Sequence, residues 1–260
     1  MSDPVAEPAK NKVYIGVPTY DGSLRAETMV GLQGRGMVDV VIRVLGMSLL
    51  TRLFNTLLGE ALNLRKKGIT HFLLHHADIG ILDPGWLDKM LLLMEQNGAD
   101  VLSAVVPIKN HEGVTSTALD RTDPVFEGWH VRRYTLAEIH ALPEKTWTHP
   151  DLLLNTGVML IDLRKPWVEN IWFRFDDRIE KDLNGHFRVL NMPEDWLFSR
   201  DAKKLGAKLY ATSEITLAHH GCQAWPSDQV YGSLKTDRGF SEPIVPLPEN
   251  QVTTGQIVST

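Results

Sequence analysis

The chain has 260 residues, of which 43% are hydrophobic and 23% are charged, as in an ordinary globular protein. Its formal net charge of −5 argues against a protein whose main task is to grip nucleic acid through the phosphates. The longest apolar runs are far too short to span a bilayer, and a single cysteine, Cys222, excludes an internal disulfide bond. We therefore expect a cytoplasmic protein with no membrane span.

Composition also divides the chain. Residues 1–10 are polar and predict a flexible N-terminal tail, whereas residues 11–240 are expected to form a single domain. Residues 241–260 carry three prolines and few large apolar groups, which predicts an extended C-terminal tail. Within the domain, residues 109–150 are rich in Thr, Asp, Pro, Gly and His. This segment is either a mobile substrate loop near the acceptor or an inserted hairpin.

Strands and helices alternate along the first half of the domain. Short strands are expected at residues 13–17 and 38–45, and a helix capped by Ser48 comes after them with apolar residues at helical spacing. Gly68 ends this helix as a left-handed terminator. The next expected elements are a strand at 69–74, a helix at 86–96 and a strand at 101–106. This order predicts βαβ units and a mostly parallel sheet.

The second half of the domain is less regular. An apolar run at residues 152–161 predicts a strand that Gly157 interrupts, and such a glycine often marks a bulge or the close approach of a ligand. A helix is expected at residues 193–205. The last expected strands are residues 208–212 and 215–218.

The most informative segment is the strand at residues 69–74 together with the polar residues directly after it. The apolar run stops at His76 and Asp78, after which Asp83 and Pro84 predict the N-cap and first position of the next helix. Ligands bind at the carboxyl ends of strands in α/β sheets. A carboxylate at this edge, beside an imidazole, is well placed to hold a divalent cation.

Seven segments in chain order resemble GT-A-fold glycosyltransferases of bacterial and phage type, which are related to the large inverting family 2. The segments are VPTY at residues 17–20, SLLTRLFN at 48–55, HADI at 76–79, VPIK at 106–109, NTGVMLI at 155–161, PEDW at 193–196 and HHG at 219–221. The resemblance implies a GT-A (Rossmann-like) α/β fold, in which helices flank a mixed, mostly parallel sheet. It also implies transfer of a hexose or pentose from a nucleoside diphosphate sugar to an acceptor hydroxyl group.

The resemblance further implies a metal site. It makes Asp78 and His219 metal ligands, and it puts His76 where the family has an aspartate that contacts the ribose or the metal. The implied ion is Mn²⁺ (or Mg²⁺), which neutralises the charge that grows on the departing diphosphate. Imidazole is softer than carboxylate, so residue 76 leaves the identity of the metal open.

An inverting transfer needs a general base that takes the proton of the acceptor hydroxyl group. The resemblance assigns this role to Asp195, with Glu194 as the substitute. Both lie in the first turn of an expected helix, where acidic residues also stabilise the helix dipole, so a purely structural role stays open. A retaining mechanism would need no such base, and the sequence does not distinguish the two outcomes.

The remaining residues of the resemblance are assigned to the nucleotide sugar. Tyr20 either stacks on uracil or packs against the protein, and Arg52 either approaches the diphosphate or makes a surface ion pair. Trp129, Trp196 and Trp225 either form platforms for a sugar ring or pack in the core, which is the commoner use of tryptophan. The implied nucleotide-sugar-binding residues are Pro18, Thr19, Tyr20, Arg52, Asn55, His76, Asn155, Thr156 and Gly157.

Two other classes of protein stay open. A zinc-dependent hydrolase would use the cluster of His75, His76, Asp78, His219 and His220. A nucleotide-sugar-binding module without catalysis would be compatible with histidine at residue 76. A Rossmann dehydrogenase is disfavoured, because no G-x-G-x-x-G motif comes after the first strand. For a glycosyltransferase, a UDP-sugar is the expected donor, and the acceptor is a glycan, a small molecule or a hydroxymethylated base of phage DNA.

Overall fold

The computed structural model describes residues 10–121, 130–181 and 184–237. The predicted tails therefore lie almost entirely outside the described residues. The boundaries between these tails and a single domain at residues 11–240 stay a prediction. Trp129 also lies outside the described residues.

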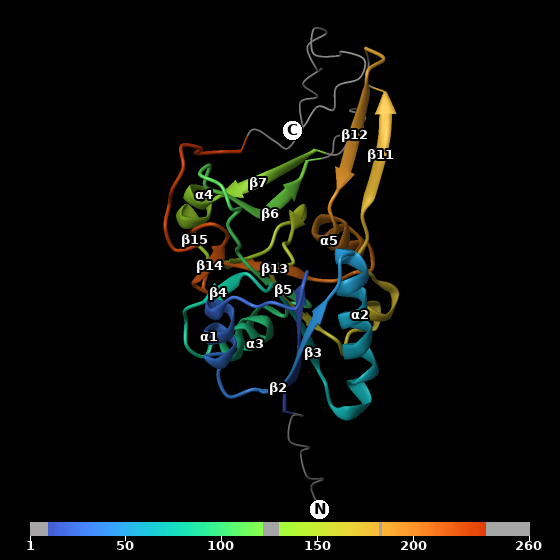
Figure 1. The fold of residues 1–260 in the computed structure, drawn as a ribbon, viewed down its shortest axis with the longest axis vertical. Helices are drawn as coiled ribbons and strands as arrows, with labels where there is room; N and C mark the ends of the chain where they lie inside the picture. The colour runs from blue at the N-terminus through green and yellow to red at the C-terminus, as the bar shows by residue number, and fades with distance from the viewer. Residues whose placement is uncertain (1–9, 122–129, 182–183, 238–260) are drawn as a thin grey trace, which may run out of the picture.

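A seven-stranded sheet forms the centre of the described part of the chain (Figure 1). Five of its strands run in one direction, because β2, β1 and β3 pair in parallel, β13 pairs in parallel with β5, and β10 is antiparallel to both β3 and β5. This arrangement confirms the predicted α/β class with a mixed, mostly parallel sheet. In spatial order the strands are β2 (Asp39–Gly46), β1 (Lys12–Thr19), β3 (His71–His75), β10 (Val158–Asp162), β5 (Val101–Ala104), β13 (Leu209–Thr212) and β8 (Thr146–Trp147).

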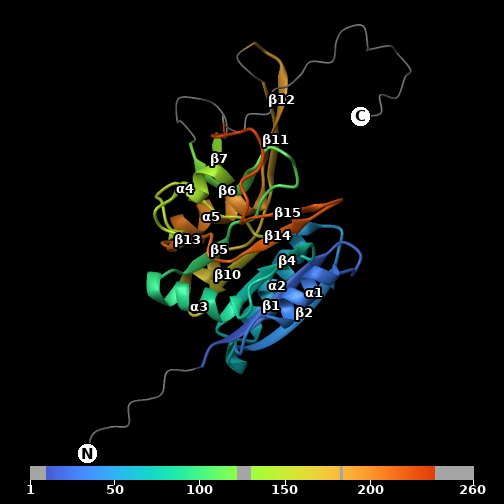
Figure 2. The ribbon, with the colours of Figure 1, turned by 90° about the vertical axis from the view of Figure 1, so that its left-hand side faces the viewer.

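Helices cover both faces of this sheet (Figures 1 and 2). Side chains alternate along β1, so that Val13, Ile15 and Val17 join the core beneath α3 (Trp86–Asn97), whereas Tyr14 joins the opposite core. That second core contains the apolar faces of α2 (Leu50–Asn63) and α5 (Glu194–Lys204). Burial on both faces explains why the strands appear in the sequence as short, nearly continuous apolar runs.

The two predicted helix starts differ in detail from the structure. Helix α2 begins at Leu50 with Leu49 as its N-cap, and no side chain caps it, so the prediction of a Ser48 cap is wrong. Helix α3 begins after Gly85, which has a φ of 70°, and Asp83 does not cap it. The Asp83 carboxylate instead accepts a hydrogen bond from the backbone N–H of Thr216 at 2.6 Å. A tertiary contact has replaced the local one.

The predicted ends of helices are confirmed where glycine adopts a left-handed conformation. The α2 segment continues as a short 3-10 turn, η1 (Arg65–Lys67), and ends at Gly68 with a φ of 91°. Gly98 ends α3 with a φ of 60°. A residue with a side chain would be strained at either position.

The run at residues 152–161 is two strands rather than one. β9 (Leu152–Leu153) pairs with β6 (Val114–Asp120) in a small sheet, whereas β10 belongs to the central sheet. Between them the Asn155 side chain accepts a hydrogen bond from the Gly157 N–H at 3.0 Å and donates one to the Ala104 carbonyl at 2.8 Å. The first bond is local, whereas the second joins this turn to the end of β5.

The segment at residues 109–150 contains an inserted hairpin. β6 pairs antiparallel with β7 (Val131–Thr135), and α4 (Leu136–Ala141) comes directly after it. Thr135 and Glu138 form a reciprocal capping box at the start of α4. Within the described residues the segment therefore contains an antiparallel strand pair, and its role near an acceptor stays a prediction.

Several elements were not predicted from the sequence. α1 (Ala26–Gln33) packs on β4 (Ile79–Ile81), which forms a three-stranded sheet with β15 (Ala224–Pro226) and with β14 (Leu217–His220), the strand that overlaps the one expected at residues 215–218. The ribbon of β11 (Asp176–Lys181) and β12 (Phe187–Met192) extends away from the central sheet (Figure 1). A further 3-10 turn, η2, spans Pro166–Asn170. The β4–β14 pairing matters most, because it places His219 opposite Ile79, next to Asp78.

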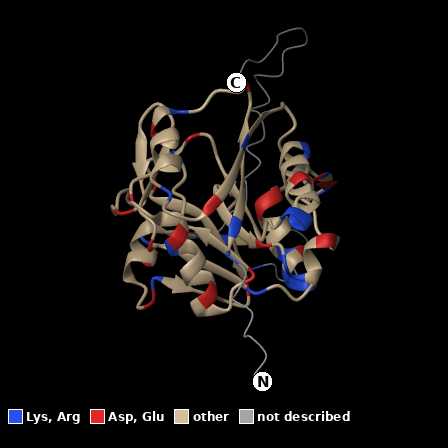
Figure 3. Cartoon of the chain, turned by 90° about the horizontal axis from the view of Figure 1, so that it is seen from below, with Lys and Arg blue, Asp and Glu red and all other residues tan. Residues whose placement is uncertain are grey.

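The surface of the protein carries both signs of charge. Seen from the end of the molecule in Figure 3, acidic and basic residues are interspersed over the helices and strands. Among the described residues, none of the helices is both long and apolar enough to pass through a membrane.

Candidate functional site

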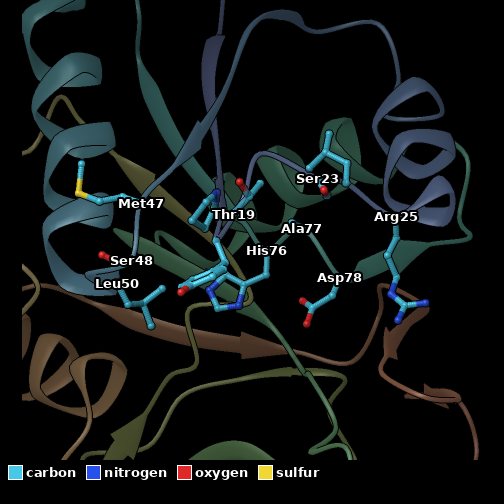
Figure 4. A pocket seen from close by; sticks show the side chains of 12 residues that line it. Thr19, Ser23, Arg25, Met47, Ser48, Leu50, His76, Ala77 and Asp78 are labelled. Atoms are coloured by element: carbon cyan, nitrogen blue, oxygen red, sulfur yellow. The ribbon is translucent and has the colours of Figure 1, made fainter.

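A pocket of about 450 Å³ lies at the carboxyl ends of β1, β2 and β3. Three chain segments build it: the end of β1 with the loop after it, the connection from β2 into α2, and the residues directly after β3. Figure 4 shows His76 and Asp78 at the centre of the pocket, between Arg25 on one side and Met47 and Leu50 on the other. The lining residues are Pro18, Thr19, Tyr20, Ser23, Leu24, Arg25, Met47, Ser48, Leu50, His76, Ala77 and Asp78.

Asp78 is held between two basic side chains. Its Oδ2 accepts a hydrogen bond from the Lys109 ammonium at 2.5 Å and lies 3.5 Å from Nε2 of His219. Burial alone raises the pKa of the Asp78 carboxyl group, but the neighbouring His219 ring and the hydrogen bond from Lys109 outweigh it and hold the pKa well below its usual range. Asp78 is therefore ionised at any physiological pH.

His219 is oriented by the backbone. Its Nδ1 lies 2.8 Å from the carbonyl oxygen of Pro107, which can only accept a hydrogen bond, so Nδ1 carries the proton. In the neutral ring the lone pair is then on Nε2, the atom that faces Asp78. A histidine whose other nitrogen donates to a carbonyl is the arrangement that metal-binding proteins use to fix a ligand.

The side chains of Asp78 and His219 would suit a hard divalent cation whose remaining ligands come from water and a substrate. Asp78 and His219 supply one carboxylate and one imidazole, and no group of three or more His, Cys, Asp or Glu side chains in the described residues is arranged to hold a metal. Mg²⁺ and Mn²⁺ bind commonly through one or two protein ligands together with water and substrate phosphates. Catalytic zinc commonly takes three protein ligands, a set that the described residues do not provide.

The other histidines of the zinc hypothesis are turned to different partners. His75 is fully buried, its Nδ1 bonds the His76 carbonyl at 3.0 Å, and its ring packs on Trp86. His220 lies 3.9 Å from Glu27. These contacts separate the two rings from Asp78, so the structure does not bring the five residues of that hypothesis into one cluster.

His76 lines the pocket and is fixed at its backbone. Its N–H donates to the Gly157 carbonyl at 2.8 Å, and its ring packs at 5.5 Å from Phe54. Burial lowers the pKa of His76 to about 4, so the ring is neutral at physiological pH. Its Nε2 is buried without a hydrogen-bond partner among the described residues, which is uncommon for a buried polar atom.

The predicted nucleotide residues on β1 line the pocket. Tyr20 is 80% exposed there, so the alternative that it packs against the protein is wrong. Thr19 is buried, and its hydroxyl oxygen accepts a hydrogen bond from the Gly22 N–H at 2.7 Å, which shapes the loop behind Tyr20. Pro18 completes this wall.

The remaining predicted binding residues are not part of the pocket lining. Arg52 is exposed on α2, whereas the Asn55 amide is used in two hydrogen bonds to the Phe173 backbone, at 2.8 Å and 2.7 Å. Asn155 and Thr156 are buried at the junction between β9 and β10. Gly157 contributes through its carbonyl bond to His76. Asn55 and Asn155 thus hold backbone segments in place.

Glu194 and Asp195 occupy the first turn of α5, as predicted, and neither lines the pocket. Burial raises the pKa of both carboxyl groups, and the charge of Glu194 raises that of Asp195 further, well above its usual range. Two hydrogen bonds of 2.9 Å connect this turn to the residue directly after β9. The Leu154 N–H donates to the Ser199 hydroxyl, and that hydroxyl donates to the Asp195 carbonyl.

Two of the three candidate sugar platforms lie in the described residues, and both are buried. Trp196 and Trp225 are each 5% exposed, and Trp196 donates its indole N–H to the Ser116 carbonyl at 3.0 Å. Their interpretation as exposed stacking surfaces is wrong, because both serve in packing.

Two cationic residues of the site were not predicted from the sequence. Arg25 lines the pocket and donates to the Gly221 carbonyl at 2.6 Å, and Lys109 bonds Asp78. Arg25 lies in the polar loop after the first strand, and Lys109 belongs to one of the seven segments, so both had a signal. Neither position shows by itself which partner its side chain takes in the folded chain.

Comparison with known proteins gives distant similarity only. No protein-family model matches the chain, and no curated protein sequence matches it. Among solved structures, protein A197 from STIV is 14% identical, with a TM-score of 0.49 over 89% of this chain and 100% of that chain. A UDP-N-acetylglucosamine pyrophosphorylase from Entamoeba histolytica, described as putative in that structure, is 11% identical, with a TM-score of 0.39 over 78% and 74%. A UDP-glucose pyrophosphorylase is 11% identical, with a TM-score of 0.35 over 80% and 76%. At such scores these structures carry no argument about the activity of this chain.

Proposed function

We propose that the protein is a metal-dependent glycosyltransferase of the GT-A type, which transfers a sugar from a nucleoside diphosphate sugar to an acceptor hydroxyl group. The observation that carries this proposal is the pocket at the strand ends, where Tyr20, His76 and Asp78 converge. A UDP-sugar is the expected donor. The acceptor is a glycan, a small molecule or a hydroxymethylated DNA base.

The wall formed by Pro18, Thr19 and Tyr20 supports nucleotide binding. An exposed tyrosine ring beside a cavity is a surface on which a base stacks, and such stacking contributes about 1–3 kcal/mol. Arg25, on the other side of the pocket, presents a guanidinium group that suits phosphate oxygens. In this proposal Arg25 contacts the diphosphate rather than Arg52, which is not part of the pocket lining.

Asp78 and His219 are proposed as the residues that hold Mn²⁺ or Mg²⁺. The ionised carboxylate and the fixed Nε2 lone pair are matched to such an ion. When bound, the cation supplies charge neutralisation to the departing diphosphate. His76 lies beside these ligands, and its unpaired Nε2 is proposed to donate to or accept from the ribose or a phosphate oxygen.

Asp195 is proposed as the general base, with Glu194 as the substitute. The acceptor oxygen forms a bond to the anomeric carbon, the bond from that carbon to the phosphate oxygen breaks with its electron pair leaving on the diphosphate, and the hydroxyl proton passes to the Asp195 carboxylate. A raised pKa makes the carboxylate a stronger base than an exposed aspartate.

The first experiment is a thermal-shift screen of UDP, GDP, ADP, CDP and dTDP and their sugars, with and without Mn²⁺. A ligand at about 100 times its dissociation constant stabilises the folded state by about 2.7 kcal/mol. We expect one nucleotide to raise the melting temperature, and more so with Mn²⁺. Full activity after exhaustive chelation would contradict the metal dependence.

Product analysis then identifies the reaction. Incubation of the donor with Mn²⁺ and candidate acceptors should release the nucleoside diphosphate and give a glycosylated acceptor, or free sugar by slow hydrolysis. A nucleotidyltransferase would instead need pyrophosphate and release a sugar 1-phosphate with a nucleoside triphosphate. Tight nucleotide-sugar binding with neither set of products would indicate a binding module.

A further inference from the structure

Lys109 forms a hydrogen bond to the Asp78 oxygen atom that is proposed to bind the metal ion. Its ammonium nitrogen lies 2.5 Å from Oδ2, the same oxygen that faces Nε2 of His219. A second, weaker contact of 3.5 Å joins the ammonium to the His220 carbonyl. The negative charge of Asp78 is therefore already balanced by a positive charge from the protein itself, the Lys109 ammonium group.

We propose that Lys109 is an internal counter-cation that neutralises Asp78 until a nucleoside diphosphate and a divalent cation arrive together, and that it then moves to the diphosphate oxygens. This inference rests on the proposed function. It makes the binding of metal and of nucleotide strongly cooperative, and it gives Lys109 a role in holding the leaving group.

The side chain of Lys109 is suited to this movement. The lysine ammonium is a compact charge on a flexible stem with three donors, so it can exchange one anionic partner for another. Both partners are partly solvated, since the Lys109 and Asp78 side chains are 37% and 33% exposed, which keeps the ion pair weak enough to break.

A glycine accommodates the stem of Lys109. The stem passes close to Gly221, where an added Cβ would lie only 3.1 Å from the Lys109 Cδ. Glycine at this position lets the stem run against the backbone without a clash. Arg25 donates a hydrogen bond to the carbonyl of the same glycine, so the side chains of Arg25 and Lys109 both contact Gly221.

The physical consequence is a coupling between two ligands. A divalent cation that binds alone must displace the ammonium from Asp78 and leave it with no new anionic partner. When the diphosphate is present, the displaced ammonium finds phosphate oxygens. Each ligand therefore strengthens the other by the same factor, as linkage requires.

The experiment measures Mn²⁺ binding by electron paramagnetic resonance on the full chain, with and without the nucleoside diphosphate of the panel UDP, GDP, ADP, CDP and dTDP that gives the largest thermal shift. We expect that nucleotide to tighten Mn²⁺ binding by about tenfold or more in the unchanged protein. In Lys109→Met, Mn²⁺ binding without nucleotide should become about three- to tenfold tighter, and the tightening by nucleotide should fall at least about fivefold. Lys109→Gln is the second variant, in case Lys109→Met does not fold.

Lys67→Met is the matched control, because Lys67 is exposed at the end of η1. It should leave both Mn²⁺ constants unchanged. If both Lys109 variants keep the coupling factor of the unchanged protein while nucleotide binding and sugar transfer are present, the role of Lys109 is overturned and the proposed function stands. If the unchanged protein binds none of the five nucleotides with Mn²⁺, both proposals fail.

Discussion

Asp78 and Asp195 carry the same chemical group in opposite environments. Asp78 lies at a strand end beside Lys109 and His219, and these neighbours hold its pKa below the ordinary range. Asp195 lies at a helix start beside Glu194, and burial together with that second acid raises its pKa well above the ordinary range. One site stabilises the carboxylate, and the other destabilises it.

The difference separates two chemical tasks. A carboxylate that stays ionised is suited to hold a cation, whereas a carboxylate that is poorly stabilised is suited to take a proton. Pairs of acids whose surroundings move their pKa values apart are characteristic of sites that need both a permanent charge and a proton acceptor. Substitutions of the two acids, and of the pocket beside Asp78, test this division of tasks.

Asp78→Asn should reduce sugar transfer to the level of the uncatalysed control. It removes the negative charge that a divalent cation needs, so Mn²⁺-dependent nucleotide binding should weaken as well. Steady-state kinetics and thermal shifts with nucleotide measure both. Asp39 is an exposed acid at the first residue of β2, the end away from the pocket, and Asp39→Asn should change neither quantity. Near-normal turnover of Asp78→Asn would show that Asp78 is only a strand-end acid.

Asp195→Asn should cut the rate of transfer by about a hundred- to ten-thousand-fold, the usual contribution of a general base. Donor affinity and Mn²⁺ dependence should stay nearly unchanged, because Asp195 does not line the pocket. Glu194→Gln is the companion variant and should have a smaller effect. A loss below tenfold in Asp195→Asn would transfer the role to Glu194 or indicate a retaining mechanism.

Tyr20→Ala and Arg25→Ala should each weaken donor binding by about tenfold, or about 1.4 kcal/mol. The first removes a stacking surface and the second a cation facing the diphosphate. Titration of donor binding by calorimetry measures both effects. Arg52→Ala is the control, since Arg52 is exposed outside the pocket lining, and it should change the affinity less than about twofold. A larger loss in Arg52→Ala than in Arg25→Ala would reverse the assignment.

Asp195→Asn should also stabilise the protein at neutral pH. The folded-state pKa of Asp195 is raised, so above that pKa the native state holds a carboxylate that burial disfavours, and asparagine removes this cost. A gain of about 1 kcal/mol corresponds to about 2–4 °C in melting temperature for a domain of this size. The gain should shrink as the pH falls through the folded-state pKa and vanish below the unfolded value of about 3.9.

Thermal melts between pH 4 and pH 8 measure this gain. Asp78→Asn should have the opposite sign at neutral pH, because it breaks the ion pair with Lys109. Destabilisation in both variants would remove the contrast between the two acids.

The amino-acid sequence alone was enough to predict the elements whose signals are local. The apolar strands at β1, β3 and β5, the helices α2, α3 and α5 and their glycine ends follow from hydrophobic period and from the left-handed conformation that glycine permits. The cluster at His76 and Asp78 was located correctly at a strand end. Local order and residue type are enough for such features, because each depends on a few consecutive residues.

Which distant residues meet became clear only from the folded chain. The β4–β14 pairing brings His219 to Asp78, the backbone bonds of Asn55 and Asn155 show that these amides position chain segments, and Lys109 reaches Asp78 across 31 residues of sequence. Other tertiary contacts replaced the expected Asp83 cap with a bond to Thr216 and buried Trp196 and Trp225. Hydrogen bonds and ion pairs between distant segments depend on how the sheets pack, and that packing is a property of the whole chain.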